Sequence, residues 1–190
     1  MMHSTFEELL SEACNVLTKK VKKQIIKSHS EMEQEVISTL KSICCEFGIN
    51  SQQVIGQGVQ KFPDIAIEEY GIEVKHTISD KWRCIGNSVS EGHRNKSIKH
   101  IYLIYGKMGG SPEVRWSKYE NAVTHVRSTH RLRFEIDMTS SPENSIFRTM
   151  GVTYDEFMCS DIKDKMKHCR KYARKRQEKR GEYIWWLGDA

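Results

Sequence analysis

The sequence has little proline and no long apolar run, and both absences limit what the protein can be. Only 3 of its 190 residues are proline, and no proline-rich stretch marks a linker between two domains. No apolar run approaches the roughly 18 residues that a transmembrane helix needs. The first residues, MMHSTFEELLSEA, carry acids where a secretory signal peptide carries basic and then apolar residues. We therefore expect a cytoplasmic protein that does not enter a membrane.

Paired cysteine motifs are also absent. None of the 6 cysteines forms a CxxC pair, and Cys44 and Cys45 are adjacent, which suits neither a zinc site nor a disulfide framework. Most fall at apolar positions of expected helices, where a thiol packs as a small hydrophobic group. We expect free thiols in a reducing compartment.

Positive charge is in moderate excess and is concentrated. The net charge is +5, from 30 Lys and Arg against 25 Asp and Glu, and residues 161–181 hold ten of the former against three of the latter. A second basic cluster is HVRSTHRLR at 125–133. Such patches favour a polyanionic partner, although a run of charge on a helix is also the ordinary solvated face of that helix.

Hydrophobic periodicity predicts a mixed α/β fold, with a central mixed β-sheet flanked by helices, in a single domain over 1–190. Helices are expected at 5–27 and 31–47, with capping boxes at Ser4 or Thr5 and at Ser30, and with Gly48 as a stop. Strands are expected near 54, at 64–68, 72–76, 100–106, 113–116 and 131–138. Further helices are expected near 88–98, at 117–127, after Pro142 and from Thr153 through the basic run.

The segment KFPDIAIEEYGIEVKHT (61–77) places three charged residues in a β-hairpin that is otherwise apolar. Asp64 begins one strand, and Glu73 lies near the middle of its partner. Side chains alternate along a strand, so Glu73 and Lys75 share one face and Val74 points to the other. Two neighbouring carboxylates repel unless a cation lies between them, and Mg²⁺ prefers such oxygens. A lysine beside them suits phosphodiester hydrolysis. The alternative is a hairpin with a polar outer face and a surface ion pair.

These residues resemble the PD-(D/E)XK nuclease superfamily, through "PD" at 63–64 and "EVK" at 73–75. The resemblance covers about residues 28–106, in the order helix, three strands, helix, strand, and implies a core like that of restriction endonucleases. It implies that Asp64 and Glu73 bind Mg²⁺, with Mn²⁺ as a substitute, that the Val74 carbonyl completes the metal shell, and that Lys75 is catalytic. The family's helix glutamate maps best to Glu33, because its spacing places it on the apolar helix face. The fallbacks are Glu31 and Glu35.

A freestanding chain of this size is most similar to a type II restriction endonuclease, a hydrolase that cuts double-stranded DNA and commonly acts as a homodimer. Residues 107–190 are then expected to supply DNA-binding and dimerisation elements. Arginine, asparagine and serine side chains are the candidates for DNA contact: Arg83, Asn87, Ser88, Arg94, Asn95, Arg127, Arg131 and Arg133. The alternatives are a Holliday-junction resolvase, a DNA-repair nickase of the same superfamily, or a DNA-binding protein without catalytic activity.

Overall fold

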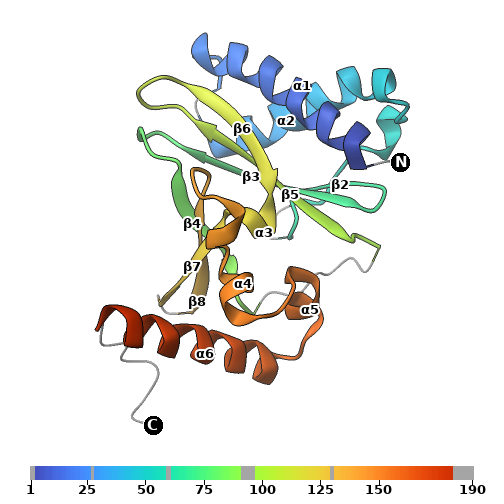
Figure 1. Cartoon of the computed structure of the whole chain (residues 1–190). Coiled ribbons are helices and arrows are strands. Elements are labelled where there is room, and N and C mark those ends of the chain that lie inside the picture. The colour runs from blue at the N-terminus through green and yellow to red at the C-terminus, as the bar shows by residue number, and fades with distance from the viewer. Residues whose placement is uncertain (1–2, 27, 59–60, 91–96, 129–130, 182–190) are drawn as a thin grey trace. The chain divides into compact units, whose positions relative to one another are not determined.

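The chain folds into a mixed α/β structure, as the sequence predicts, and its contacts divide it into two compact units. The computed structural model describes residues 3–26, 28–58, 61–90, 97–128 and 131–181 (Figure 1). The first unit comprises Met1–Cys84 and Arg94–Tyr119, and the second comprises Ile85–His93 and Glu120–Ala190. No linker in the sequence marks this division, and the sequence analysis predicts a single domain over 1–190. The first unit holds residues 28–84 and 94–106 of the segment that resembles the nuclease core, whereas Ile85–His93 belongs to the second unit.

The first unit is built on a five-stranded mixed sheet in the order β1-β2-β3-β5-β6. β1, β2 and β3 form an antiparallel meander, β3 and β5 are parallel, and β6 returns antiparallel to β5. The strands are β1 (Ile55–Gly56), β2 (Ile65–Ile67), β3 (Tyr70–Thr77), β5 (His100–Lys107) and β6 (Glu113–Lys118). The helices are α1 (His3–Lys22), α2 (His29–Ile43) and the short 3-10 turns η1 (Cys44–Phe47) and η2 (Ser51–Gln53).

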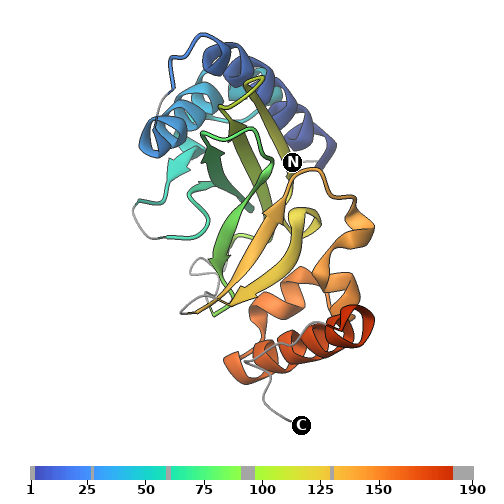
Figure 2. The ribbon, with the colours of Figure 1, turned by 90° about the vertical axis from the view of Figure 1, so that its left-hand side faces the viewer.

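Helices α1 and α2 lie side by side against one face of this sheet (Figure 2). Phe6 of α1 stacks on Tyr70 of β3, with ring centroids 4.1 Å apart. Met32, Val36 and Leu40 form the buried stripe of α2 and belong to the same core cluster as the β3 side chains Tyr70, Ile72 and Val74. Because strand side chains alternate, Gly71, Glu73 and Lys75 face away from these helices.

The two N-terminal helices agree with the prediction, but their caps do not. Ser28, rather than Ser30, caps α2, and its hydroxyl accepts a hydrogen bond from the Glu31 amide. A serine two residues earlier competes for the same role, and the spacing of the apolar stripe does not discriminate between them. α1 already includes His3, so Ser4 and Thr5 lie inside the helix. Gly48 ends the segment at φ 74°, as expected.

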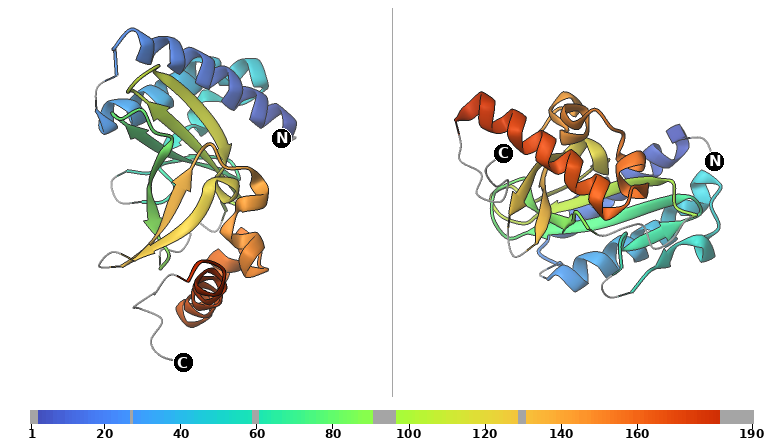
Figure 3. Two further views of the ribbon diagram at one scale, coloured as in Figure 1. Left: turned by 60° about the vertical axis from the view of Figure 1, so that its left-hand side comes forward. Right: turned by 90° about the horizontal axis from the view of Figure 1, so that it is seen from below.

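The second unit pairs a three-stranded sheet with helices. Its strand order is β4-β8-β7, and β7 and β8 are antiparallel. Phe134 of β8 contacts Phe147 and Phe157, at centroid distances of 5.7 and 5.9 Å, and α6 packs along α4 and α5 (Figure 3). The elements are β4 (Arg83–Ser88, which starts in the first unit), α3 (Tyr119–Ala122), β7 (Val123–Ser128), β8 (Leu132–Asp137), η3 (Pro142–Asn144), α4 (Ile146–Met150), α5 (Tyr154–Cys159) and α6 (Ile162–Arg180).

Three predicted helices differ from the observed elements. The helix predicted near 88–98 does not begin at Ser88, because Ser88 is the last residue of strand β4. Residues 91–96 lie outside the described part. The helix at 117–127 is reduced to α3, since Val123 and Val126 are buried in β7 instead. The helix that starts at Thr153 ends at Cys159, and Asp161 caps a new helix by accepting from the Asp164 amide. The predicted capping box of Thr153 and Glu156 is confirmed.

Gly71 permits a close approach that shapes the hairpin. A Cβ atom at this position would lie 2.4 Å from Pro63 Cγ and 2.8 Å from Ile101 Cδ1. Because overpacking in a filled core costs about 1–3 kcal/mol, we expect Gly71→Ala to lower the free energy of unfolding by about that amount, as measured by urea denaturation.

Gly56→Ala is the matched control, because its Cβ would meet only the flexible tip of Ile37, at 3.0 Å. We expect a clearly smaller loss of stability for this variant. Equal losses for the two variants would show that the close packing at Gly71 is not what stabilises the hairpin.

Candidate active site

The β2–β3 hairpin places the Asp64 carboxylate opposite the Glu73 carboxylate. Its two-residue turn is Glu68–Glu69, with Glu68 at φ 53°, and its register pairs Ile67 with Tyr70 and Ile65 with Ile72. Asp64 immediately precedes Ile65, so the same register carried one residue further sets Asp64 opposite Glu73. The two acidic residues are therefore neighbours across the hairpin although nine positions separate them in the sequence.

A hydrogen bond fixes Asp64 against β3. The Val74 amide donates to Asp64 Oδ2 over 2.7 Å. β2 begins only at Ile65, so the carboxylate takes the place of the backbone acceptor that a longer β2 would have offered. On the other side, the Gln57 amide donates to the Asp64 carbonyl oxygen over 2.7 Å. The backbone and the side chain of Asp64 are thus both held.

Glu73 is buried, and only one of its two carboxylate oxygens has a hydrogen-bond donor among the described residues. One of its oxygens, Oε1, accepts from Lys75 Nζ over 2.5 Å, and the two side chains are 5% and 22% exposed. No hydrogen-bond donor in the described part of the chain reaches the other oxygen, Oε2. A buried carboxylate oxygen without a donor is costly, and such an atom is a usual ligand for a cation.

The electrostatics of the pair follow from this burial. Burial raises the pKa of the Glu73 carboxyl to about 7, the Lys75 ammonium opposes that shift, and the nearby Asp64 carboxylate adds to it. Burial also lowers the pKa of the Lys75 ammonium, but the Glu73 carboxylate outweighs that effect and the net shift is upward. Burial and the Asp64 carboxylate therefore disfavour the ionised form of Glu73, and a bound cation would stabilise that form.

The donor set fits a magnesium ion better than a metal held wholly by protein. Among the described residues no group of three or more histidine, cysteine, aspartate or glutamate side chains is arranged to hold a metal. Mg²⁺ is commonly bound by one or two carboxylates, with water and substrate phosphates filling the remaining positions. Asp64 and Glu73 supply two carboxylates, and Glu73 Oε2 is a buried oxygen that lacks a donor.

The face of the sheet that carries Lys75 continues across two more strands. Lys75 pairs with Tyr105 of β5, which pairs with Arg115 of β6. The Tyr105 hydroxyl donates to the Arg83 carbonyl over 3.0 Å, and the Trp82 ring lies 5.7 Å from the Tyr105 ring and 4.3 Å from the Arg115 guanidinium carbon. Sequence reasoning missed these neighbours, because the parallel register of β3 and β5 brings them together.

Helix α2 carries the predicted helix glutamate, Glu33. α2 packs against the face of β3 that carries Val74, whereas Glu73 points to the opposite face. Glu33 is half-buried on α2, and its part in the site stays a prediction. Of the two fallbacks, Glu35 forms an ion pair with Lys20 of α1 over 2.7 Å, and Glu31 is exposed at the start of α2.

The predicted DNA contacts around β4 divide into three groups. Arg83 is exposed at the start of the strand. Asn87 and Ser88 are 6% and 3% exposed and belong to the second unit, and their contact with DNA stays a prediction. Arg94 and Asn95 lie outside the described residues.

The predicted contacts around β7 and β8 are all in the second unit. Arg127 is exposed and forms an ion pair with Glu135. Arg133 is half-buried and donates to the Gly86 carbonyl over 3.3 Å, a structural bond between β8 and β4. Arg131 is exposed and precedes β8. Arg127 and Arg131 are thus the exposed members of the three.

The bond between Asp64 and Val74 can be tested with two substitutions of one residue. Asp64→Ala leaves the buried Val74 amide without an acceptor, which costs about 1–3 kcal/mol of unfolding free energy. Asp64→Asn retains an oxygen acceptor while removing the same charge, so we expect it to be more stable than Asp64→Ala by about that amount. Urea denaturation gives the difference, and amide hydrogen exchange at Val74 reports the bond directly. Equal stability and equal Val74 protection in the two variants would contradict the assignment.

The described part of the chain contains no helix long and apolar enough to cross a membrane. Comparison with protein-family models, with curated proteins and with solved structures finds no match to this chain. The function is therefore argued from the geometry of Asp64, Glu73 and Lys75 and from the charge of the surface.

Proposed function

We propose that the protein is a magnesium-dependent endonuclease that hydrolyses phosphodiester bonds of double-stranded DNA, with Mn²⁺ able to replace Mg²⁺. One observation carries the proposal. Two carboxylates meet across the hairpin beside a lysine, and the buried one, Glu73, has an oxygen without a hydrogen-bond donor. A purely structural ion pair between Glu73 and Lys75 would not account for the second carboxylate or for the unsatisfied oxygen.

Each of the three side chains has a distinct task in this proposal. A magnesium ion, when bound, supplies positive charge that polarises the phosphate and lowers the pKa of a bound water. Asp64 accepts from the Val74 amide at Oδ2 and would hold the ion through its other oxygen, Oδ1. Glu73 contributes its buried oxygen, and the Val74 carbonyl is the proposed further ligand. Lys75 holds its ammonium at Glu73 Oε1 and keeps other N–H bonds for an oxygen of the phosphate, where negative charge develops.

The substrate assignment rests on charge and on the resemblance in the sequence. The net charge is +5, and basic residues are concentrated in residues 161–181, as a protein that binds a phosphate backbone requires. A type II restriction endonuclease acting as a homodimer is the favoured form of this activity. A junction resolvase or a repair nickase would use the same three side chains on DNA of another geometry.

The catalytic proposal predicts metal-dependent cleavage that depends on Lys75. Supercoiled plasmid should be cut in Mg²⁺ or Mn²⁺ and left intact in EDTA. Lys75→Met and Glu73→Gln should each lower the rate by about 100-fold or more, because such groups contribute at least that factor to catalysis. Gel electrophoresis of time courses measures the rates.

Lys99→Met is the matched control for this experiment. Lys99 is also ion-paired, to Glu69 over 2.7 Å, but it is exposed and lies at the hairpin turn away from Glu73. Its loss should leave the cleavage rate within about threefold. Plasmid that stays intact with wild-type protein in both metals, or cleavage that survives Lys75→Met, would refute the proposal.

The form of the products distinguishes the kinds of nuclease. Discrete fragments from linear DNA are expected for a sequence-specific enzyme, and sequencing their ends gives the recognition site and the cut position. Cleavage confined to four-way junctions would instead identify a resolvase. Single-strand nicks without double-strand breaks would identify a nickase.

A further inference from the structure

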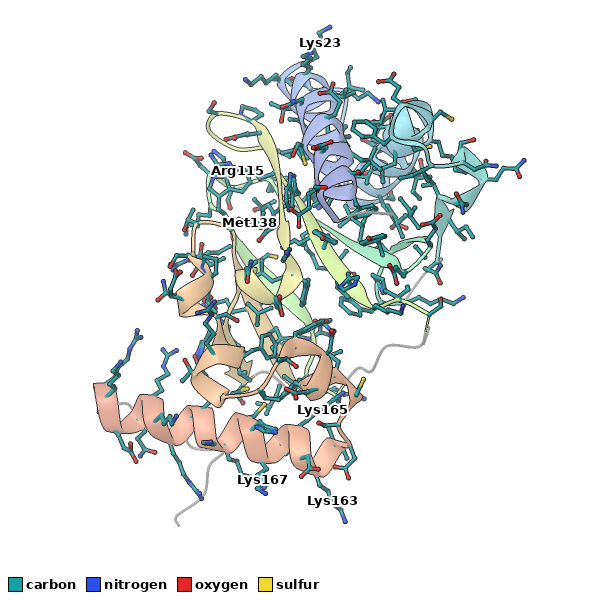
Figure 4. The ribbon with its side chains drawn as sticks, turned by 45° about the vertical axis from the view of Figure 1, so that its right-hand side comes forward. Lys23, Arg115, Met138, Lys163, Lys165 and Lys167 are labelled. Atoms are coloured by element: carbon teal, nitrogen blue, oxygen red, sulfur yellow. The ribbon has the colours of Figure 1, made fainter. Side chains whose placement is uncertain are left out.

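The outer side of α6 carries a line of five basic residues, here called the α6 stripe. They recur at helical spacing along one side of the helix, and all are exposed: Lys163, Lys167, Arg170, Lys171 and Arg174. Figure 4 labels two of them, Lys163 and Lys167, which project away from α4 and α5. The stripe lies wholly within the second unit.

The packing of α6 explains why these side chains point outward. The opposite side of the helix is buried through Lys165, Cys169, Tyr172 and Ala173. Phe157 of α5 lies under the Lys165 ammonium, 6.0 Å from the ring centroid. With one side of α6 committed to α4 and α5, the remaining side is presented to solvent as a fixed surface.

The charge of the α6 stripe is not neutralised within the described residues. None of its five side chains takes part in an ion pair or a hydrogen bond there. Elsewhere in the chain, by contrast, Lys107 pairs with Asp80, Arg115 with Glu113 and Arg127 with Glu135. Uncompensated positive charge held on a rigid element is the usual signature of a polyanion-binding surface.

The composition of the stripe favours a phosphate backbone over a lipid surface. A helix that lies in a membrane interface buries a side rich in leucine, phenylalanine or tryptophan. On α6 the buried side is already packed, and the only large exposed hydrophobic residue of this helix is Ile162. The stripe itself contains lysine and arginine alone.

We propose that the α6 stripe binds the sugar-phosphate backbone of duplex DNA, independently of the catalytic residues. From residue 163 to residue 174 the helix rises about 16 Å, a length over which one DNA strand presents several phosphates at 3.4 Å of axial rise each. The choice of DNA among polyanions rests on the proposed nuclease function, whereas backbone binding by the stripe does not. The contacts would position the duplex without reading its sequence.

If the α6 stripe binds phosphates, the affinity for DNA depends on the salt concentration in a predictable way. The slope of log K against log salt is about −0.9 for each neutralised phosphate, so five contacts give a slope near −4 to −5. Lys167→Gln, Arg170→Gln and Arg174→Gln, combined in one variant, remove three contacts. We expect its slope to be smaller in magnitude by about 2.5 to 3, and its affinity for a 20-bp duplex to fall at least tenfold at about 100 mM salt.

Binding is measured by fluorescence anisotropy in buffer that contains Ca²⁺ and no Mg²⁺, so that the measured affinity does not depend on DNA cleavage. The matched control, here called the α1 control, is Lys19→Gln with Lys22→Gln and Lys23→Gln. It removes the same charge from exposed positions in the last turn of α1 and just after it, in the first unit. It should keep the wild-type slope to within about 0.5 and the affinity within about threefold. Circular dichroism and thermal melting check that both variants are folded, and the single variant Arg170→Glu repeats the test with minimal change.

The outcomes separate this proposal from the catalytic one. If the stripe variant and Arg170→Glu bind as wild type does, or if the α1 control loses as much affinity as the stripe variant, the stripe proposal is overturned even where the protein cuts DNA. Stripe-dependent binding without cleavage supports the stripe and refutes the nuclease. Tighter binding to vesicles with 30% phosphatidylserine than to DNA, lost in the stripe variant, would assign the surface to membranes and overturn the proposal.

Discussion

The hydrogen bond from the Val74 amide to Asp64 Oδ2 is the constraint on which the candidate site depends. It continues the β2–β3 ladder with a side chain, and so fixes a carboxylate at the end of a strand that would otherwise fray. Pro63 packs over Gly71, at a position that no larger residue could occupy without displacing it. These two close contacts hold Asp64 opposite Glu73 and account for a glycine and a proline in a segment that is otherwise typical of strands.

Burial raises the electrostatic cost of that arrangement. Two carboxylates beside each other repel, and burial makes the repulsion harder to screen. Lys75 compensates only part of the negative charge, and the pKa of Glu73 remains raised to about 7 because burial and Asp64 outweigh the lysine. Apolar residues packed at these positions would often make the protein as stable or more stable. Buried charges that cost stability, in an otherwise regular sheet, are typical of functional sites.

Local sequence patterns predicted much of this structure, but not the parts that depend on long-range pairing. The alternation in 64–76 and the apolar run at 100–106 gave the hairpin, the buried strand β5 and the placement of Glu73 and Lys75 on one face. The register of β3 with β5, which brings Tyr105 and Arg115 into line with Lys75, has no local signal. Val123–Ser128 was assigned to a helix because its neighbours favour helix and its strand partner, β8, comes later in the chain. Glu33 was assigned from the resemblance and from the helix period, neither of which reveals which face of the sheet the helix covers, and its part in the site stays a prediction.

Whether Asp64 and Glu73 hold a metal ion is the central claim. The most direct test titrates ¹⁵N-labelled protein with Mn²⁺, whose paramagnetism broadens the amide resonances nearest to it. The account predicts that the amides of Asp64 and of Glu73–Lys75 broaden first, at substoichiometric metal, and that Mg²⁺ in excess restores them. First broadening elsewhere in the chain, with these amides unaffected, would contradict it.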